Sequence, residues 1–131
     1  MARTVEVLLG LAIHKLSAAE GLKQMRFYED AISRAYYGMY HAAQALLIAY
    51  GKKALGHAGT ISAFNHHFVK KGLIPEKYTA WFSELKESRE FADYEPLKKF
   101  TKKDVEQAIK ETEEFIKIAR VLIRKKTKVK A

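Results

Sequence analysis

Apolar side chains recur every three to four residues along most of the chain, and no convincing stretch alternates apolar and polar positions. This period is typical of amphipathic helices, whereas strands alternate with a period of two. It predicts five helices, at about residues 3 to 23, 26 to 50, 57 to 71, 76 to 94 and 102 to 125. Short connections between long helices favour antiparallel neighbours. We therefore expect an all-α fold, an up-and-down antiparallel bundle of about five helices.

Glycine, proline and one polar motif mark the expected helix ends. Gly51 and Gly72 each follow a long periodic segment, and glycine commonly ends a helix. Pro75 opens and Pro96 closes the fourth segment, since proline is tolerated in a first helical turn but not in a helix interior. The motif Thr-Lys-Lys-Asp at residues 101–104 matches a capping box before the last helix. These ends predict one bundle domain over residues 1–125, followed by a frayed basic tail at 126–131.

The predicted last helix has the most regular apolar face of the chain. Its inward positions are Val105, Ala108, Ile109, Thr112, Phe115, Ile116, Ala119, Leu122 and Ile123. A face of this width indicates a helix that packs along its whole length against the bundle core.

The second predicted helix carries two stripes that lie more than a right angle apart. One stripe is apolar: Ile32, Tyr36, Met39, Ala43, Leu46, Leu47 and Tyr50. The other combines small, aromatic and polar residues: Arg34, Tyr37, Gly38, His41 and Ala45. We expect such a helix to be covered on both sides, by its own bundle and by a neighbouring helix or a second subunit. The small residues Gly38 and Ala45 would allow close approach at that second contact.

Arg34 and His41 nearly eclipse one another on this helix, because each residue turns the chain by about 100°. In the structural interpretation, Arg34 pairs with Asp30 one turn back, and His41 is a hydrogen-bonded interface histidine. In the functional interpretation, the two form a polar pair that contacts a phosphate or activates a hydroxyl.

The fourth predicted helix brings an arginine onto its inward stripe. Arg89 follows Leu85 by four residues, Asp93 follows Arg89 by four, and Tyr94 comes next. A charged group on a half-buried stripe needs a partner. Arg89 and Asp93 either satisfy each other or leave the arginine fork free to bind a phosphate in a groove.

The formal net charge of +9 favours anionic partners such as RNA, DNA, nucleotides or an acidic protein. The alternative is a basic surface that only keeps the protein soluble. The chain has no cysteine, which excludes disulfides and thiolate metal sites. Adjacent His66 and His67 project in different directions from a helix, so we expect no metal. The sequence has no phosphate-cradling glycine loop, and we expect no cofactor. No apolar run approaches the roughly 20 residues of a membrane span, and we expect a cytoplasmic protein.

Three stretches together resemble the HEPN domain, in its branch of small stand-alone prokaryotic proteins. They are YEDAISRAYYGMYHAAQALL, GHAGTISAFNHHFVKKGLIP and LKESREFADY, in the right order. The resemblance implies a helical bundle and a symmetric homodimer. It also implies RNase or toxin activity in many members, often beside a minimal nucleotidyltransferase that acts as antitoxin.

Catalytic members of this family carry an arginine, four to six residues, and then a histidine late in the bundle. Arg89 matches the arginine, but the histidine position of the four-residue form is Tyr94, and the tyrosine two positions later is replaced by Pro96. The resemblance therefore selects Arg89 and Tyr94 as catalytic candidates, and Asp93 joins them because it is spaced to pair with Arg89. Arg34 and His41 are the second choice, because six residues separate them.

Three functions follow from these residues. The first is a toxin-type protein that binds RNA or nucleotide, with or without weak metal-independent RNase activity, partnered with a nucleotidyltransferase antitoxin. The second is a non-enzymatic helical dimer that binds a nucleotide or a protein. The third is a dimeric scaffold without a ligand. The missing histidine near Arg89 favours binding over competent cleavage.

Overall fold

The computed structural model of the chain describes residues 2–53, 55–94 and 99–130, with side chains to residue 127. Its elements are α1 (Ala2–Gln24), α2 (Tyr28–Ala49), α3 (Gly56–Phe64), the short π-helix η1 (Asn65–Val69), α4 (Lys77–Tyr94) and α5 (Lys102–Lys130). These ranges contain no strand. The predicted all-α bundle is confirmed, and α3 with η1 forms the third predicted helix. No helix within the described ranges is long and apolar enough to cross a lipid bilayer.

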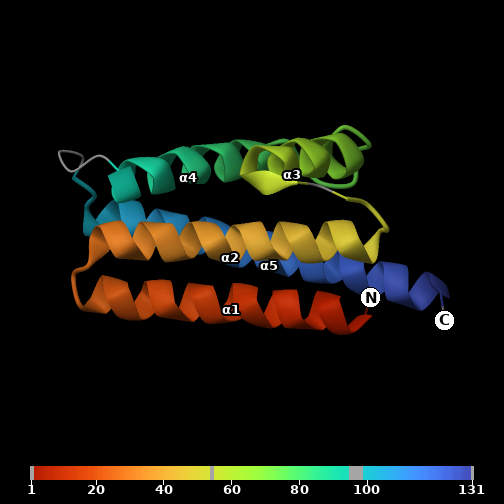
Figure 1. The fold of residues 1–131 in the computed structure, drawn as a ribbon, viewed down its shortest axis with the longest axis horizontal. Helices are drawn as coiled ribbons and strands as arrows, with labels where there is room; N and C mark the ends of the chain where they lie inside the picture. Colours follow the sequence, from red (N-terminus) through yellow and green to blue (C-terminus); the bar gives the residue numbers. More distant parts are fainter. Residues whose placement is uncertain (1, 54, 95–98, 131) are drawn as a thin grey trace.

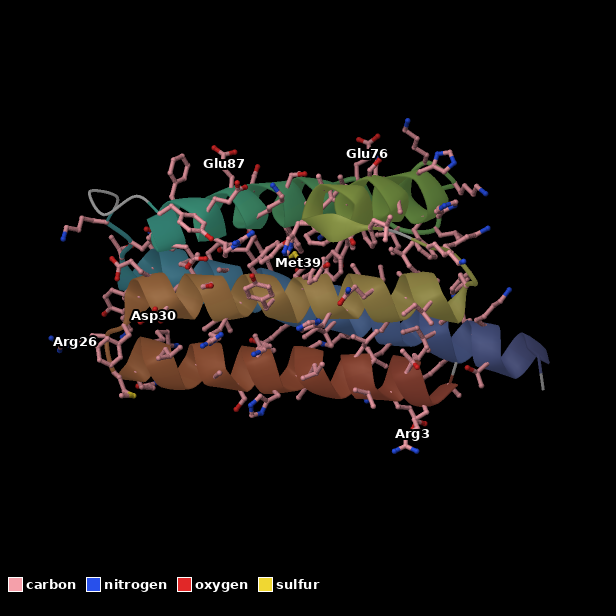
Figure 2. The ribbon with its side chains drawn as sticks, in the orientation of Figure 1. Arg3, Arg26, Asp30, Met39, Glu76 and Glu87 are labelled. Atoms are coloured by element: carbon pink, nitrogen blue, oxygen red, sulfur yellow. The ribbon has the colours of Figure 1, made fainter. Side chains whose placement is uncertain are left out.

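The helices form three layers, with α2 and α5 between α1 and the layer made by α3 and α4 (Figure 1). Helix α2 packs against all four of the other α-helices. Met39 of α2 points toward the α3–α4 layer and is fully buried, whereas Glu87 of α4 points away from the bundle (Figure 2). The second helix is therefore covered on both sides within a single chain.

The apolar face of α5 is buried at every position that the periodicity predicts. Phe115 from this face stacks on Phe64 of α3, with ring centroids 4.9 Å apart, and meets Phe82 of α4 at 5.3 Å. Burying one such side chain contributes about 1.5–3 kcal/mol. This aromatic core holds α3 and α4 in place over α2, where the candidate site lies.

Gly38 lies against helices of its own chain, which is one of the two neighbours that the sequence left open. A Cβ atom at Gly38 would lie 3.0 Å from Thr112 Cγ2 of α5 and 3.2 Å from the carbonyl oxygen of Ala12 in α1. Ala45, expected at the same contact, is also fully buried. Glycine is favoured because α1 and α5 approach α2 so closely here that a Cβ atom would displace its neighbours. The second cover of α2 is thus a neighbouring helix of the same chain.

The predicted helix ends are mostly confirmed. Gly51 and Gly72 adopt φ angles of +69° and +77°, which glycine tolerates best. The capping box is formed, because the Thr101 N–H donates to Asp104 Oδ2 at 2.9 Å and the Asp104 N–H donates to Thr101 Oγ1 at 3.1 Å. Helix α5 continues to Lys130, whereas the periodicity predicts an end near 125. The expected stop at Pro96 lies outside the described residues.

Candidate functional site

Arg89 lies on the inner face of α4 with only 10% of its side chain exposed. Its guanidinium carbon lies 5.2 Å from the centre of the Tyr36 ring and 5.7 Å from that of Tyr37, both on α2. Its Nη1 is 3.5 Å from Asp93 Oδ2, a long contact for an ion pair. Its Nε is buried and has no hydrogen-bond partner among the described residues. The guanidinium is therefore only partly satisfied by the protein, although it is almost enclosed.

His57, at the start of α3, contacts the rings of Tyr36 and Tyr37, which Arg89 also contacts. Its Nδ1 lies 2.6 Å from the hydroxyl oxygen of Tyr36, within hydrogen-bond distance. Its ring centre lies 4.4 Å from that of Tyr40 and 5.9 Å from that of Tyr37. We call the set Tyr36, Tyr37, Tyr40, His57 and Arg89 the Arg89 cluster. Three elements far apart in the sequence meet in it.

The protonation states in the Arg89 cluster follow from burial and from its cation. Burial, and then the positive charges of Arg89 and Lys86, lower the pKa of His57 below its ordinary value. Burial also raises the pKa of the Tyr36 phenol, an effect that the Arg89 charge offsets only in part. At neutral pH, His57 is therefore an uncharged imidazole and Tyr36 keeps its proton.

His41 and Arg34 differ in their relation to this cluster. The ring of His41 lies 5.7 Å from that of Tyr40 and 6.2 Å from that of Tyr37, and its Nδ1 is 3.0 Å from Gln44 Oε1. His41 thus lies at the edge of the Arg89 cluster, beside Tyr37 and Tyr40. Arg34 is exposed on α2. Although both residues are described, no ion pair joins Arg34 to Asp30, so the pairing expected from their spacing is not formed.

Tyr94 lies apart from the cluster despite following Asp93 directly. Its side chain is 77% exposed, and within the described part of the chain it contacts none of the cluster's rings. Of the predicted candidates, the structure brings together Arg89 and Asp93, with His41 at the rim. It leaves Tyr94 and Arg34 outside.

Sequence reasoning missed His57 and the role of the three tyrosines. The available signal was their place in the stretches that carry the family resemblance, because Tyr36, Tyr37 and Tyr40 lie in SRAYYGMYH and His57 in GHAG. Nothing in the spacing of His57 and Arg89, 32 positions apart (89 − 57), indicates that they meet. Their common contact with Tyr36 is set by the packing of α3 and α4 on α2.

The cluster offers two kinds of contact to a ligand. Arg89 offers a cationic fork suited to phosphate oxygens, although it shares one nitrogen with Asp93. The half-buried rings of Tyr37, Tyr40 and His41 offer flat faces on which a nucleobase can stack. Among the described residues, no group of three histidine, aspartate or glutamate side chains gathers closely enough to hold a metal ion.

The lowered pKa of His57 predicts acid sensitivity. The folded chain binds a proton at His57 less readily than the unfolded chain, whose histidine has the ordinary pKa of 6.5. The free energy of unfolding should therefore fall as pH drops below about 6.5, because protons then favour the unfolded state. His67, whose pKa is lowered by burial and by His66, acts in the same direction.

Urea unfolding between about pH 7 and pH 5 measures this effect. His57→Gln should remove part of the acid sensitivity, while His14→Gln, an exposed change on α1, should leave it intact. Equal pH dependence in the wild type and both variants would contradict the assignment.

Comparison with known proteins identifies the family of the chain. The model of the HEPN domain family matches residues 5–122. The chain is 37% identical over 112 residues to "Putative toxin MJ0605" of Methanocaldococcus jannaschii, covering 86% of this chain and 83% of that protein. It is 32% identical over 102 residues to a UPF0332 protein of Thermotoga maritima, covering 78% and 76%. A second M. jannaschii protein, "Putative toxin MJ0142", is 30% identical over 104 residues, covering 79% and 71%.

Proposed function

Because the chain belongs to the HEPN domain family, we propose that it is a toxin-type protein that binds RNA or a nucleotide at the Arg89 cluster. The proposal rests on one observation, that the buried guanidinium of Arg89 lacks partners within the described residues for part of its hydrogen-bond donors. Its guanidinium is held on two tyrosine rings, and its Nε has no partner in the described structure. A buried cation left partly unsatisfied by the protein is suited to an anionic ligand.

Each residue of the site has a role in this proposal. Arg89 binds a phosphodiester or a terminal phosphate, and Asp93 orients the guanidinium from one side. His57 adds a neutral ring nitrogen next to the phosphate. Tyr37 and Tyr40, with His41 at the rim, provide the surface for a base. Stacking of one base on an aromatic side chain contributes about 1–3 kcal/mol.

Charge favours the Arg89 cluster, with its arginine, over the hollows of the described surface as a phosphate site. A hollow of about 450 Å³ lies between α4 and α5, but Glu84, Glu87, Asp104 and Glu111 line it. These carboxylates would repel a phosphate. An open groove of about 430 Å³ between α3 and α4 is lined by Ser62, Asn65, Thr79 and Ser83, and by Lys86 together with the carboxylates of Glu87 and Glu90. Two carboxylates against one lysine make this groove a poor phosphate site as well.

Binding without efficient cleavage is the activity we infer. Tyr94 is exposed and makes no ring contact with the cluster within the described residues, so it is not placed to act on a ligand bound there. RNA cleavage, if measured, should be weak and metal-independent. The non-enzymatic nucleotide-binding alternative differs from this proposal only in the complete absence of cleavage.

The partners belong to the proposal as well. Relatives that carry a toxin name support a toxin–antitoxin context, and the family resemblance supports a minimal nucleotidyltransferase as antitoxin. A homodimer remains part of the proposal. Gly38 does not belong to the contact between its subunits, because it packs against helices of its own chain. The exposed apolar side chains Val7, Leu11 and Ile13 of α1 and Val121 of α5 give a surface for a second copy to cover.

Fluorescence anisotropy with a short single-stranded RNA tests the binding. Affinity should fall as salt rises from about 50 to 200 mM, with a logarithmic slope of about −0.7 for each phosphate that the protein neutralises. The double variant Arg124→Gln/Lys125→Gln, at exposed positions of α5, should reduce the slope yet retain binding, because these residues lie outside the cluster. The absence of RNA binding even at low salt would reject the proposal.

A further inference from the structure

We propose that Tyr36 holds His57 in the tautomer that carries its proton on Nε2, so that neutral His57 presents a hydrogen-bond donor, and no base, to a bound ligand. The role toward the ligand depends on the function proposed above. The tautomer itself does not, because it is a property of the free protein.

The direction of the hydrogen bond between Tyr36 and His57 follows from what each atom can reach. Tyr36 is fully buried, and its hydroxyl has one partner within the described residues, Nδ1 of His57 at 2.6 Å. If Nδ1 carried the proton, the buried hydroxyl would have nowhere to donate its own. An unsatisfied buried donor costs about 1–3 kcal/mol. The hydroxyl therefore donates, and Nδ1 accepts with its lone pair.

The proton of neutral His57 must then be on Nε2, because a neutral imidazole carries one N–H. Within the described residues Nε2 has no hydrogen-bond partner, and it is not among the buried polar atoms that lack one. This nitrogen of the half-buried His57 thus offers a donor that no described residue accepts. Bound phosphate oxygens are acceptors and match such a donor.

The charges around His57 keep it in this neutral state. On α4, Arg89 and Lys86 oppose a second proton, and Glu90 favours it. Glu90 is exposed and already paired with Lys86 at 2.9 Å, which weakens its effect. The groups that face His57 from α2 are Tyr36, Tyr37, Tyr40 and His41. A second proton would also break the bond from Tyr36, because Nδ1 could no longer accept it.

This arrangement has a consequence for RNA chemistry. A general base must offer a lone pair to the proton of the attacking 2′-hydroxyl. In His57 the lone pair on Nδ1 is occupied by the Tyr36 proton, and Nε2 carries a proton already. His57 can therefore bind a phosphoryl oxygen but cannot deprotonate a 2′-hydroxyl. Tyr36 acts as a positioning residue that selects ligand binding over cleavage.

Nitrogen-15 NMR of the histidine side chains tests this inference on the ligand-free protein. In the wild type at neutral pH, His57 should give an unprotonated signal for Nδ1 and a protonated signal for Nε2. Tyr36→Phe, which removes only the hydroxyl, should produce a mixture of tautomers and move the pKa of His57 back toward its ordinary value of 6.5.

Tyr50→Phe is the matched control. Tyr50 also donates a hydrogen bond from its hydroxyl, to the carbonyl oxygen of Leu122 at 3.0 Å, but it does not contact His57. This variant should leave the His57 signals unchanged. A proton on Nδ1 in the wild type would overturn the inference, and so would unchanged His57 signals in Tyr36→Phe. The wild-type spectrum decides the tautomer even if Tyr36→Phe fails to fold. Because the readout needs no ligand, its failure is distinguishable from a failure of RNA binding.

Discussion

Arg89→Gln is expected to weaken the binding of a short single-stranded RNA by about 10- to 150-fold. A charge-assisted hydrogen bond contributes about 1.5–3 kcal/mol, and each 1.4 kcal/mol corresponds to about a tenfold change in affinity. Glutamine keeps much of the side-chain length that packs on Tyr36 and Tyr37, so the change removes mainly the charge and the fork. Fluorescence anisotropy at fixed salt measures the loss.

Arg34→Gln is the control for this change. It removes the same charge from an exposed position on α2, outside the cluster. A general loss of attraction for RNA would affect both variants alike. We therefore expect Arg34→Gln to lower affinity by less than about threefold, as for one screened surface charge. If Arg89 serves only to pair with Asp93, Arg89→Gln should reduce stability and leave RNA affinity equal to that of the control.

Gly38→Leu is expected to destabilise the fold by about 3 kcal/mol or more. Even a Cβ atom at this position would lie 3.0 Å from Thr112 Cγ2 and 3.2 Å from the backbone oxygen of Ala12. Overpacking of a core commonly costs about 1–3 kcal/mol, and the rest of a leucine side chain has no space here. The helix propensity gained on replacing glycine, below about 1 kcal/mol, is too small to offset this. Urea unfolding measures the difference.

Gly10→Leu provides the comparison for Gly38. Gly10 also lies within a helix, on the exposed side of α1, and nothing approaches its Cβ position within 4 Å. This change should leave stability equal or slightly higher. The loss in Gly38→Leu should also be independent of protein concentration, because Gly38 contacts its own chain. A loss that appears only at low concentration would instead indicate a contact between subunits.

Periodicity predicted the helices well because burial in this fold repeats with the helical turn. The face of α5 from Val105 to Ile123 is buried as predicted, since one continuous core runs along it. The capping box at Thr101 was also readable, because its hydrogen bonds join residues only three positions apart. Features determined by neighbours in sequence could thus be predicted directly.

The candidate site was predictable only in part, because it depends on contacts between distant helices. Arg89 was recognised as a polar interruption of an apolar stripe. His57 could not be linked to Arg89, because the link is the ring of Tyr36 on a third helix. Tyr94 was selected by its place in the family motif, but its side chain points into solvent. Gly38 was correctly identified as a point of close approach, but its neighbour was left open, since periodicity does not distinguish a helix of the same chain from one of a partner.

The central claim is that the Arg89 cluster binds RNA through its guanidinium, and the Arg89 Nε–H signal in nitrogen-15 NMR tests it most directly. This N–H is buried and without a partner in the described structure. It belongs to the same planar guanidinium as the other Arg89 donors, so a phosphate that binds this guanidinium should shift its resonance. Titration with a short single-stranded RNA should shift the Arg89 Nε–H and His57 Nε2–H signals together and leave the Arg34 signal in place. Shifts confined to arginines of α5, such as Arg120 and Arg124, with Arg89 and His57 unmoved at saturating RNA, would contradict the account.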